Sequence, residues 1–198
     1  AGVAPWLYAF GFTLLLVYVA YYDWRDGKVY TLPLIPLFVV AYVKQLTIGA
    51  MLPAVMSMLI LGAAFLGIFL LGQIGMGDVL LNLCIGLFFS SLYQLGWYLV
   101  AMAMFGAFYV TAYYFYYTKH KDYEPKGRFG FGGFTEEIPV EELTTDMILN
   151  GGRFITFTTE DDVERLQQRG GTVRIAHRWP GVPIMLVSFI LTFLAFHI

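Results

Sequence analysis

The sequence predicts an all-α polytopic membrane protein with six transmembrane helices and a small cytoplasmic α/β insert between helices five and six. Its composition indicates this first. Of the 198 residues, 59% are hydrophobic and 13% are charged, whereas a soluble domain carries about 25% charged residues. The charged residues are also concentrated in one region of the chain. The formal net charge is only −2, which does not favour a nucleic acid as partner.

Six apolar stretches define the expected spans, because a helix that crosses about 30 Å of hydrocarbon needs about 20 apolar residues. The first stretch lacks a basic n-region and a clear cleavage site, so we expect it to be retained in the membrane rather than removed as a signal peptide. Gly96 is the expected break between the fourth and fifth spans. The expected spans are Pro5–Tyr22, Val29–Leu46, Leu52–Leu71, Val79–Leu95, Trp97–Tyr117 and Pro183–Ile198.

The polar region follows the fifth span. Residues Lys119 to Arg178 hold 9 of the 12 Lys and Arg and 11 of the 14 Asp and Glu. We therefore expect a five-helix membrane region at 1–118, a cytoplasmic polar insert at 119–179 and a sixth transmembrane helix at 180–198. The second half of the insert has the composition of two strands with a capped helix between them: Phe154–Thr158, Thr159 as the cap of Glu160–Arg169, Gly170-Gly171 as its end, and Thr172–Ile175.

The distribution of Lys and Arg predicts the orientation in the membrane. If six spans alternate, nearly all these residues flank one side, and only Lys44, beside Gln45 at the far end of the second span, flanks the other. The positive-inside rule places the richer side in the cytoplasm. We expect a multi-pass protein of the cell membrane, in contact with its lipids. The residues on the cytoplasmic side are Arg25, Lys28, Lys119, Lys121, Lys126, Arg128, Arg174 and Arg178.

The sequence Gly75-Met76-Gly77-Asp78 separates two almost wholly apolar stretches. A carboxylate in lipid is costly, so Asp78 is expected to face a protein interior, a water-filled cavity or the interface. The glycines allow a sharp turn and a close approach to another segment. A structural interpretation stays open beside this one, because Asp is also a good N-cap for the helix that follows.

Asp23 ends the first span and, with the expected topology, shares a face and a depth with Asp78. Two neighbouring carboxyl groups hold one proton between them. One then acts as general base on a water molecule, and its protonated partner protonates the leaving group of a scissile amide. This chemistry requires no metal and no cofactor. An ion pair of Asp23 with Arg25 or Lys28 is the structural alternative.

These residues resemble the GxGD membrane aspartyl peptidases, and in particular the archaeal preflagellin (prearchaellin) and type IV prepilin peptidases. The resemblance lies in Asp23-Trp24-Arg25 after the first span, Gly75–Asp78 opening the fourth, and a polar insert before the last. It implies that Asp23 and Asp78 are catalytic, with Gly75, Met76, Gly77 and Arg25 around them. It also implies a substrate, the class III signal peptide of prearchaellins or archaeal prepilins, which is cut at the cytoplasmic membrane face.

Some residues depart from the family pattern. Leu80 stands where many members have Lys, and the paired CxxC zinc motifs and N-methylating domain of bacterial members are absent, which favours a peptidase without methyltransferase activity. Pro180-Gly181-Val182-Pro183 resembles the Pro-rich start of the last span in archaeal members. From another functional class, a proton- or ion-coupled transporter could use Asp23 and Asp78 as a relay, and a structural membrane subunit would use neither.

Other polar residues support no second site. Cys84 is the single cysteine and excludes an internal disulfide and a Cys-based zinc site. His120, His177 and His197 lack metal-ligand spacing. We expect the aromatic and glycine-rich segment 126–134 to be an interfacial loop, and Asn82 to hydrogen-bond within the helix bundle.

Overall fold

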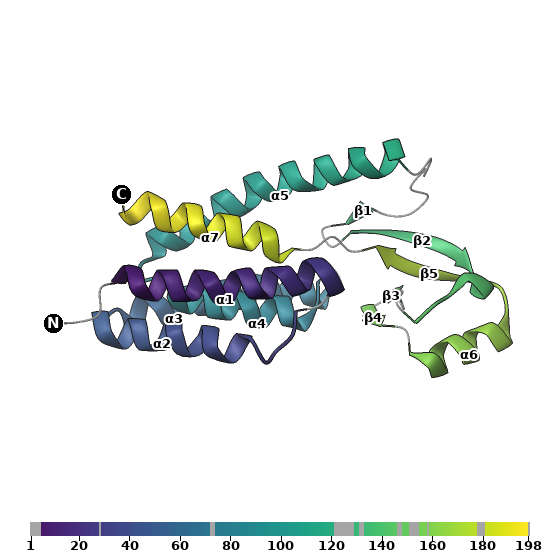
Figure 1. Cartoon of the computed structure of the whole chain (residues 1–198), viewed down its shortest axis with the longest axis horizontal. Coiled ribbons are helices and arrows are strands. Elements are labelled where there is room, and N and C mark those ends of the chain that lie inside the picture. The colour runs from purple at the N-terminus through teal and green to yellow at the C-terminus, as the bar shows by residue number, and fades with distance from the viewer. Residues whose placement is uncertain are drawn as a thin grey trace. The chain divides into compact units, whose positions relative to one another are not determined.

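The computed structural model describes residues 5–27, 29–71, 74–120, 129–130, 133–145, 148–150, 155–157, 159–177 and 181–197. The chain divides into two compact units (Figure 1). The first comprises residues 1–66, 76–112 and 180–198, and it contains both aspartates of interest. The second comprises residues 67–75 and 113–179.

The chain is mostly helical, which confirms the coarse prediction. Three helices contain segments long and apolar enough to cross a membrane: Trp6–Asp26, Met51–Leu70 and Leu92–Ala112. Three shorter apolar helices accompany them. The apolar helices are α1 (Pro5–Asp26), α2 (Leu34–Ile48), α3 (Met51–Leu70), α4 (Met76–Phe88), α5 (Leu92–His120) and α7 (Val182–His197).

Two helix boundaries differ from the prediction. Helix α1 continues through the charged segment to Asp26, and the turn comes at Gly27, whose positive φ of 62° suits glycine. The expected fourth span is interrupted at residues 89–91 rather than at Gly96, which lies inside α5. The reason is capping: the Gln94 N–H donates to Ser91 Oγ at 3.3 Å, as in a helix N-cap. Ser91 is a possible N-cap in the sequence, but the apolar residues around it make the helix start hard to recognise.

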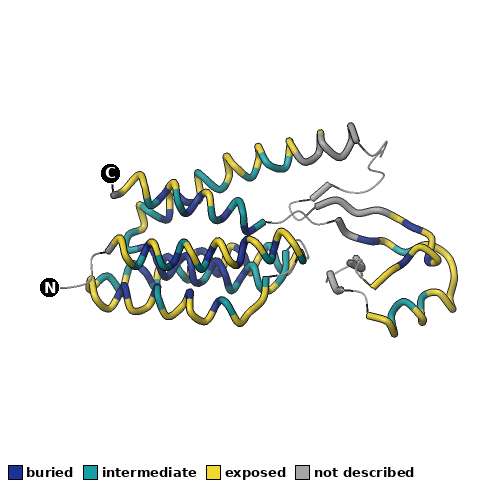
Figure 2. Tube along the Cα trace, viewed as in Figure 1, coloured by how far each residue is buried: buried dark blue, intermediate teal, exposed yellow. Residues whose placement is uncertain are grey.

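Aromatic rings join α1, α4 and α7 in the core of the first unit. The ring centroid of Phe12 lies 4.5 Å from that of Phe88 and 5.0 Å from that of Phe189, and the latter two rings are 5.1 Å apart. The outer sides of α1 and α7 are apolar and exposed (Figure 2). Phe10, for example, is 61% exposed. An apolar exterior around a packed core is the pattern expected of helices surrounded by lipid.

The second unit contains a five-stranded sheet of strand order β1-β2-β5-β3-β4, in which the recorded pairings are antiparallel. Helix α6 (Glu160–Arg169) packs Val163 and Leu166 on a core of Ile138, Leu143 and Ile175. The strands are β1 (Phe129–Gly130), β2 (Gly133–Pro139), β3 (Ile148–Asn150), β4 (Ile155–Phe157) and β5 (Thr172–His177), with a short 3-10 helix at Val140–Glu142.

The prediction for α6 is confirmed. The Asp162 N–H donates to Thr159 Oγ1 at 3.2 Å, and the Thr159 N–H donates back to Asp162 Oδ2 at 3.2 Å, so the two residues form a capping box. Gly170 ends the helix with a φ of 65°. Hydrogen bonds from Thr159 hold the pKa of Asp162 below its usual value. The two expected strands are present as β4 and β5, and Phe154 and Thr158 lie outside the described residues.

Candidate active site

Asp23 is buried near the end of α1. Its residue is only 6% exposed, and its Oδ2 accepts a hydrogen bond of 2.9 Å from the backbone N–H of Val182. Val182 is the first residue of α7 and is itself fully buried. A carboxylate at a helix N-terminus is stabilised by the unpaired N–H groups and by the helix dipole. The Asp23 carboxylate therefore connects α1 to the start of α7.

Asp78 lies in the first turn of α4 and is half-buried. Because the helix begins at Met76, Asp78 is its third residue and not its N-cap, so the prediction of Asp78 as the N-cap is wrong. A carboxylate there still interacts favourably with the dipole of the helix. Gly75 directly precedes α4, and Met76 is exposed at its first position.

Asn82, one turn beyond Asp78, ties this end of α4 to two other helices. Its Nδ2 donates to the Asp78 carbonyl at 2.9 Å and lies 3.4 Å from Met185 Sδ on α7. Its Oδ1 accepts from the Tyr98 hydroxyl on α5 at 3.2 Å. Both Asn82 and Tyr98 are fully buried. Asn82 thus hydrogen-bonds within the bundle, as predicted, and α7 contacts both helices that carry the aspartates.

Helices α1 and α4 run antiparallel, as two contacts show. Phe12 meets Phe88 at the end of α4, and Val29, just after α1, meets Gly77 at the start of α4. Along the chain, 11 residues separate Phe12 from Asp23 and 10 separate Asp78 from Phe88. At a rise of about 1.5 Å per residue, these separations are roughly 16 Å and roughly 15 Å. Asp23 and Asp78 therefore lie at the same level of the bundle.

Gly77 permits the close approach at that level. A Cβ at this position would lie 2.6 Å from the Val29 carbonyl oxygen and 2.8 Å from the Val29 Cβ. Such contacts are far inside van der Waals distance, so any side chain would force the start of α4 away from the segment after α1. The second glycine of Gly-x-Gly-Asp is thus explained by packing between two segments.

Arg25 lies away from Asp23. It forms a bidentate ion pair with Asp26, with Nε to Oδ1 at 2.6 Å and a second bond of 2.9 Å to Oδ2. Its guanidinium also lies 4.7 Å from the ring centroid of Tyr22. Residues two apart on a helix point about 200° apart, so Arg25 and Asp23 occupy opposite faces of α1. The ion-pair alternative for Asp23 therefore finds no support in Arg25, and Lys28 lies outside the described residues.

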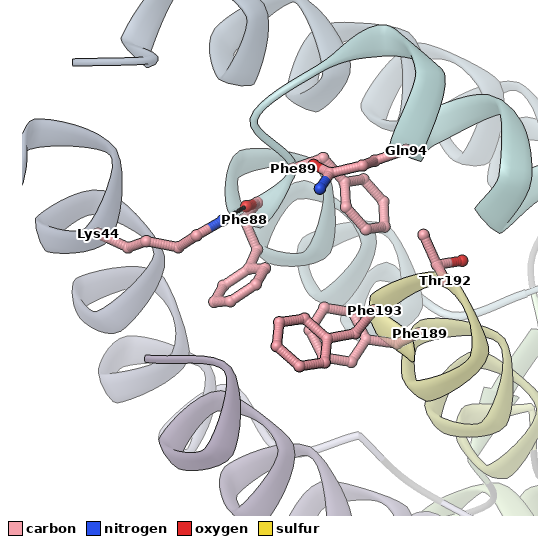
Figure 3. Close-up of a pocket in the computed structure, with 7 residues that line it drawn as sticks. All are labelled: Lys44, Phe88, Phe89, Gln94, Phe189, Thr192 and Phe193. Atoms are coloured by element: carbon pink, nitrogen blue, oxygen red, sulfur yellow. Dashed lines mark hydrogen bonds between the residues drawn. The ribbon is translucent and has the colours of Figure 1, made fainter. Parts of the chain in front are cut away.

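Lys44 and Gln45 lie near the end of α2, which ends at Ile48, so they mark the far end of that helix as predicted, and both are buried beside the C-terminal end of α4. Lys44 is 4% exposed and Gln45 is fully buried. Lys44 Nζ donates to the Phe88 carbonyl at 2.5 Å (Figure 3), and Gln45 Nε2 donates to the carbonyls of Leu87 and Phe88 at 2.9 and 2.7 Å. These side chains satisfy carbonyls that the last turn of a helix leaves without partners.

The pocket beside Lys44 is not a substrate site. Its volume is about 10 Å³, which is room for a single water molecule. It also lies at the end of α4 opposite Asp78. Figure 3 shows the Lys44 side chain extending toward Phe88, with the rings of Phe89, Phe189 and Phe193 beyond Phe88. The lining residues are Lys44, Phe88, Phe89, Gln94, Phe189, Thr192 and Phe193.

The sequence did not reveal two neighbours of Asp23. The Val182 N–H is one, and its role depends on where α7 packs. Tyr109 on α5 is the other, because its hydroxyl lies within electrostatic reach of the Asp23 carboxyl. Among the described residues, no group of three His, Cys, Asp or Glu side chains is placed to hold a metal ion.

No protein-family model, curated protein or solved structure matches this chain. Function is therefore inferred from the arrangement of its own residues.

Proposed function

We propose that this chain is a membrane aspartyl endopeptidase of the GxGD type. Asp23 and Asp78 are its catalytic pair, and Gly77 allows the start of α4 to lie against the segment that follows α1. Its substrates are the class III, prepilin-like signal peptides of prearchaellins or archaeal prepilins. The observation that supports the proposal is the opposite direction of α1 and α4, which the Phe12–Phe88 and Val29–Gly77 contacts indicate and which is consistent with a common level for two acidic residues far apart in sequence.

Burial and like charge support a chemical role for the pair. Two carboxyl groups at one level in a largely apolar bundle do not both ionise cheaply, so the working pair carries a single proton. The ionised member accepts a proton from water, whose oxygen attacks the scissile carbonyl carbon. The protonated member gives its proton to the leaving nitrogen as the C–N bond breaks. We therefore expect a bell-shaped dependence of the cleavage rate on pH.

The membrane arrangement is part of the same proposal. Six apolar helices cross, with α2, α4 and α7 as the shorter ones, and the level of Asp23 and Asp78 faces the cytoplasm. The burial of Lys44 against α4 supports this orientation, because the one cation at the other end is engaged in capping a helix. A signal peptide cut just before an apolar helix would present its scissile bond at the same depth as the pair.

Incubation of the purified protein in detergent with a panel of prearchaellin and prepilin substrates tests the proposal. We expect a gel shift from loss of the signal peptide, with the cut at the start of the apolar segment as read by mass spectrometry. The same preparation in proteoliposomes tests the transporter alternative. Proton or ion flux that depends on Asp23 and Asp78, without cleavage of any substrate, would replace the peptidase by a relay.

A further inference from the structure

One face of α5 is buried near the start of the helix and exposed farther along it. Leu95 and Tyr98 are buried, and the Tyr98 ring centroid lies 5.3 Å from that of Phe89. At 3.6 residues per turn, residues seven or eleven apart point within about 20° of each other, so Phe105 and Tyr109 continue the face of Tyr98. Phe105 is nevertheless 39% exposed. From residue 99 to residue 112, every residue of α5 is exposed or half-buried (Figure 2).

A glycine and a methionine belong to the same face. Gly106 follows the buried Leu95 by eleven residues and shares its direction, yet no heavy atom among the described residues lies within 4 Å of a Cβ added to it. Met102 lies one turn beyond Tyr98 and is half-buried. We call Met102, Phe105, Gly106 and Tyr109 the inner face of α5.

The inner face of α5 reaches the level of Asp23. At the start of α5, the ring centroid of Tyr93 lies 6.4 Å from that of Phe196, near the end of α7. Farther along α5, the Tyr109 hydroxyl lies within electrostatic reach of Asp23, which accepts from Val182 at the start of α7. The two helices therefore run in opposite directions. From Tyr93 to Tyr109 is 16 residues and from Val182 to Phe196 is 14, roughly 24 Å and roughly 21 Å along the helices.

The polarity of the inner face changes along its length. Its polar end is the Tyr109 hydroxyl beside the Asp23 carboxyl, and apolar side chains and Gly106 follow. Packing closes the face at Tyr98, 11 residues or roughly 16 Å from Tyr109. A phospholipid would bring its anionic phosphate toward the Asp23 carboxyl, which is unfavourable. A peptide cut just before an apolar helix instead brings neutral main chain to Asp23 and an apolar helix to the rest of the face.

We infer that the inner face of α5 docks the apolar helix of the substrate, with the start of that helix beside Asp23. The inference rests on the proposed function and names the surface that holds the substrate beyond the cut. About three turns of a helix fit along the face. Glycine lets another helix approach closely, and methionine adapts its side chain to different partners. The face contributes binding rather than chemistry, so a change in it should raise KM and leave kcat unchanged.

Two glycines of α5 provide a matched pair of variants. Gly96 is exposed and points about 160° away from Tyr98, whereas Gly106 belongs to the inner face. At neither glycine does a heavy atom among the described residues lie within 4 Å of an added Cβ, so both leucine variants should fold. We expect Gly106→Leu to raise KM about tenfold, because its side chain occupies the space of the docked helix, and Gly96→Leu to leave KM unchanged. Equal KM values in the two variants would overturn the inference.

Disulfide cross-linking locates the docked helix directly and requires no cleavage. Cys84 is the single native cysteine and is buried, so an introduced cysteine reacts alone. In an Asp78→Asn background, we expect Phe105→Cys to cross-link to a prearchaellin whose only cysteine lies in the first three turns of its apolar helix. Met104→Cys is the control, because Met104 is 67% exposed but points about 200° away from Met102. It should give only background cross-linking.

Each other outcome has a definite meaning. Equal cross-linking from Phe105→Cys and Met104→Cys would show that α5 has no preferred docking face and would overturn the inference. A disulfide between two Phe105→Cys chains, without a cross-link to substrate, would assign the face to a second copy and overturn it as well. Cleavage by the unmodified protein without a Phe105→Cys cross-link would reject the docking face alone. A Phe105→Cys cross-link in a protein that cleaves no substrate would uphold the docking face and reject the peptidase.

Discussion

Polar residues lie at both ends of α4, but they have different kinds of partner at the two ends. Each has polar side chains at the edge of an apolar helix and buries them against neighbouring helices. At the C-terminal end, Lys44 and Gln45 meet main-chain carbonyls, so cation and amide face the negative end of the helix dipole. At the N-terminal end, two acidic residues lie at one level, where the proposed pair would share a single proton.

This difference suggests how polar residues that stabilise the fold can be distinguished from polar residues that carry out catalysis. Opposite partners at the Lys44 end stabilise the bundle and leave room for one water molecule. In the proposed pair at the Asp23 end, two carboxyl groups would repel each other unless they shared a proton, and such an arrangement is typical of a functional site. Changes at the two ends should therefore affect different measurements.

The largest effect is expected from removing either carboxyl group. Asp23→Asn or Asp78→Asn should lower cleavage by roughly a thousandfold or more, because losing one member disables the unit. If Asp78 only supported its helix, its replacement by Asn would change stability by about 0.3–1 kcal/mol through the dipole and leave cleavage intact. The assay is the gel shift of a prearchaellin, with membrane insertion checked for each variant.

Asp26→Asn is the matched control for both aspartates. It lies on α1 three residues beyond Asp23, where it pairs with Arg25 and accepts from the Tyr30 hydroxyl at 3.1 Å. We expect it to retain most of the activity. Loss of cleavage in Asp26→Asn alone would show that the wrong carboxyl groups have been assigned.

A smaller but still large effect is expected at Gly77. The Cβ of Gly77→Ala would collide with the backbone of Val29, so we expect cleavage to fall at least tenfold and the unfolding temperature in detergent to drop. Gly96→Ala is the control, since it lies in α5 with no heavy atom within 4 Å of an added Cβ. It should stabilise the protein by up to about 1 kcal/mol through helix propensity. Equal activity of the two variants would show that contact with Val29 does not matter.

At the opposite end of α4, Lys44→Met should change stability more than chemistry. It removes the donor to the Phe88 carbonyl while keeping most of the apolar stem, so we expect a loss of about 1–3 kcal/mol of unfolding free energy. Thermal unfolding in detergent measures this loss. Cleavage at a temperature where the variant is folded should stay within a few-fold of the original. A hundredfold loss of cleavage without a change in stability would place Lys44 in the chemistry and break the comparison.

The smallest effect is expected at the capping box of α6. There, as at the start of α7, a side-chain oxygen accepts from an N–H group in the first turn of a helix, but the site is exposed. Thr159→Ala should destabilise α6 by about 1 kcal/mol, as for other N-cap losses. Because the pKa of Asp162 is lowered in the folded state, its contribution is present above the unfolded value of about 3.9 and is lost as pH falls through the folded value. Hydrogen exchange of the α6 amides from pH 3 to pH 7 measures the stability of α6 as a function of pH. Thr159→Ala should weaken this pH dependence, and an unchanged pH dependence would show that the capping box does not act through Asp162.

The sequence by itself determined the features that follow from local chemistry. Apolar composition predicted the helices, Thr159 and Gly170 predicted the bounds of α6, and the acidic residues at the edges of apolar stretches predicted Asp23 and Asp78 as candidates. Each of these depends on a residue and its near neighbours, which a linear pattern records. The break before Leu92 was also local, yet the apolar residues around Ser91 and Gln94 hid it.

Only the tertiary structure decided the partners of the polar groups. Lys44 reads as an interfacial lysine in the sequence, but the packing of α2 on α4 buries it against the Phe88 carbonyl. The sequence allows an ion pair between Arg25 and Asp23, but on helix α1 these two side chains point in opposite directions, and Arg25 pairs with Asp26. The Val182 N–H and the fit of Gly77 against Val29 depend on contacts between distant segments. Hydrophobicity belongs to each residue, whereas a hydrogen-bond partner is set by where helices cross, which the sequence pattern does not specify.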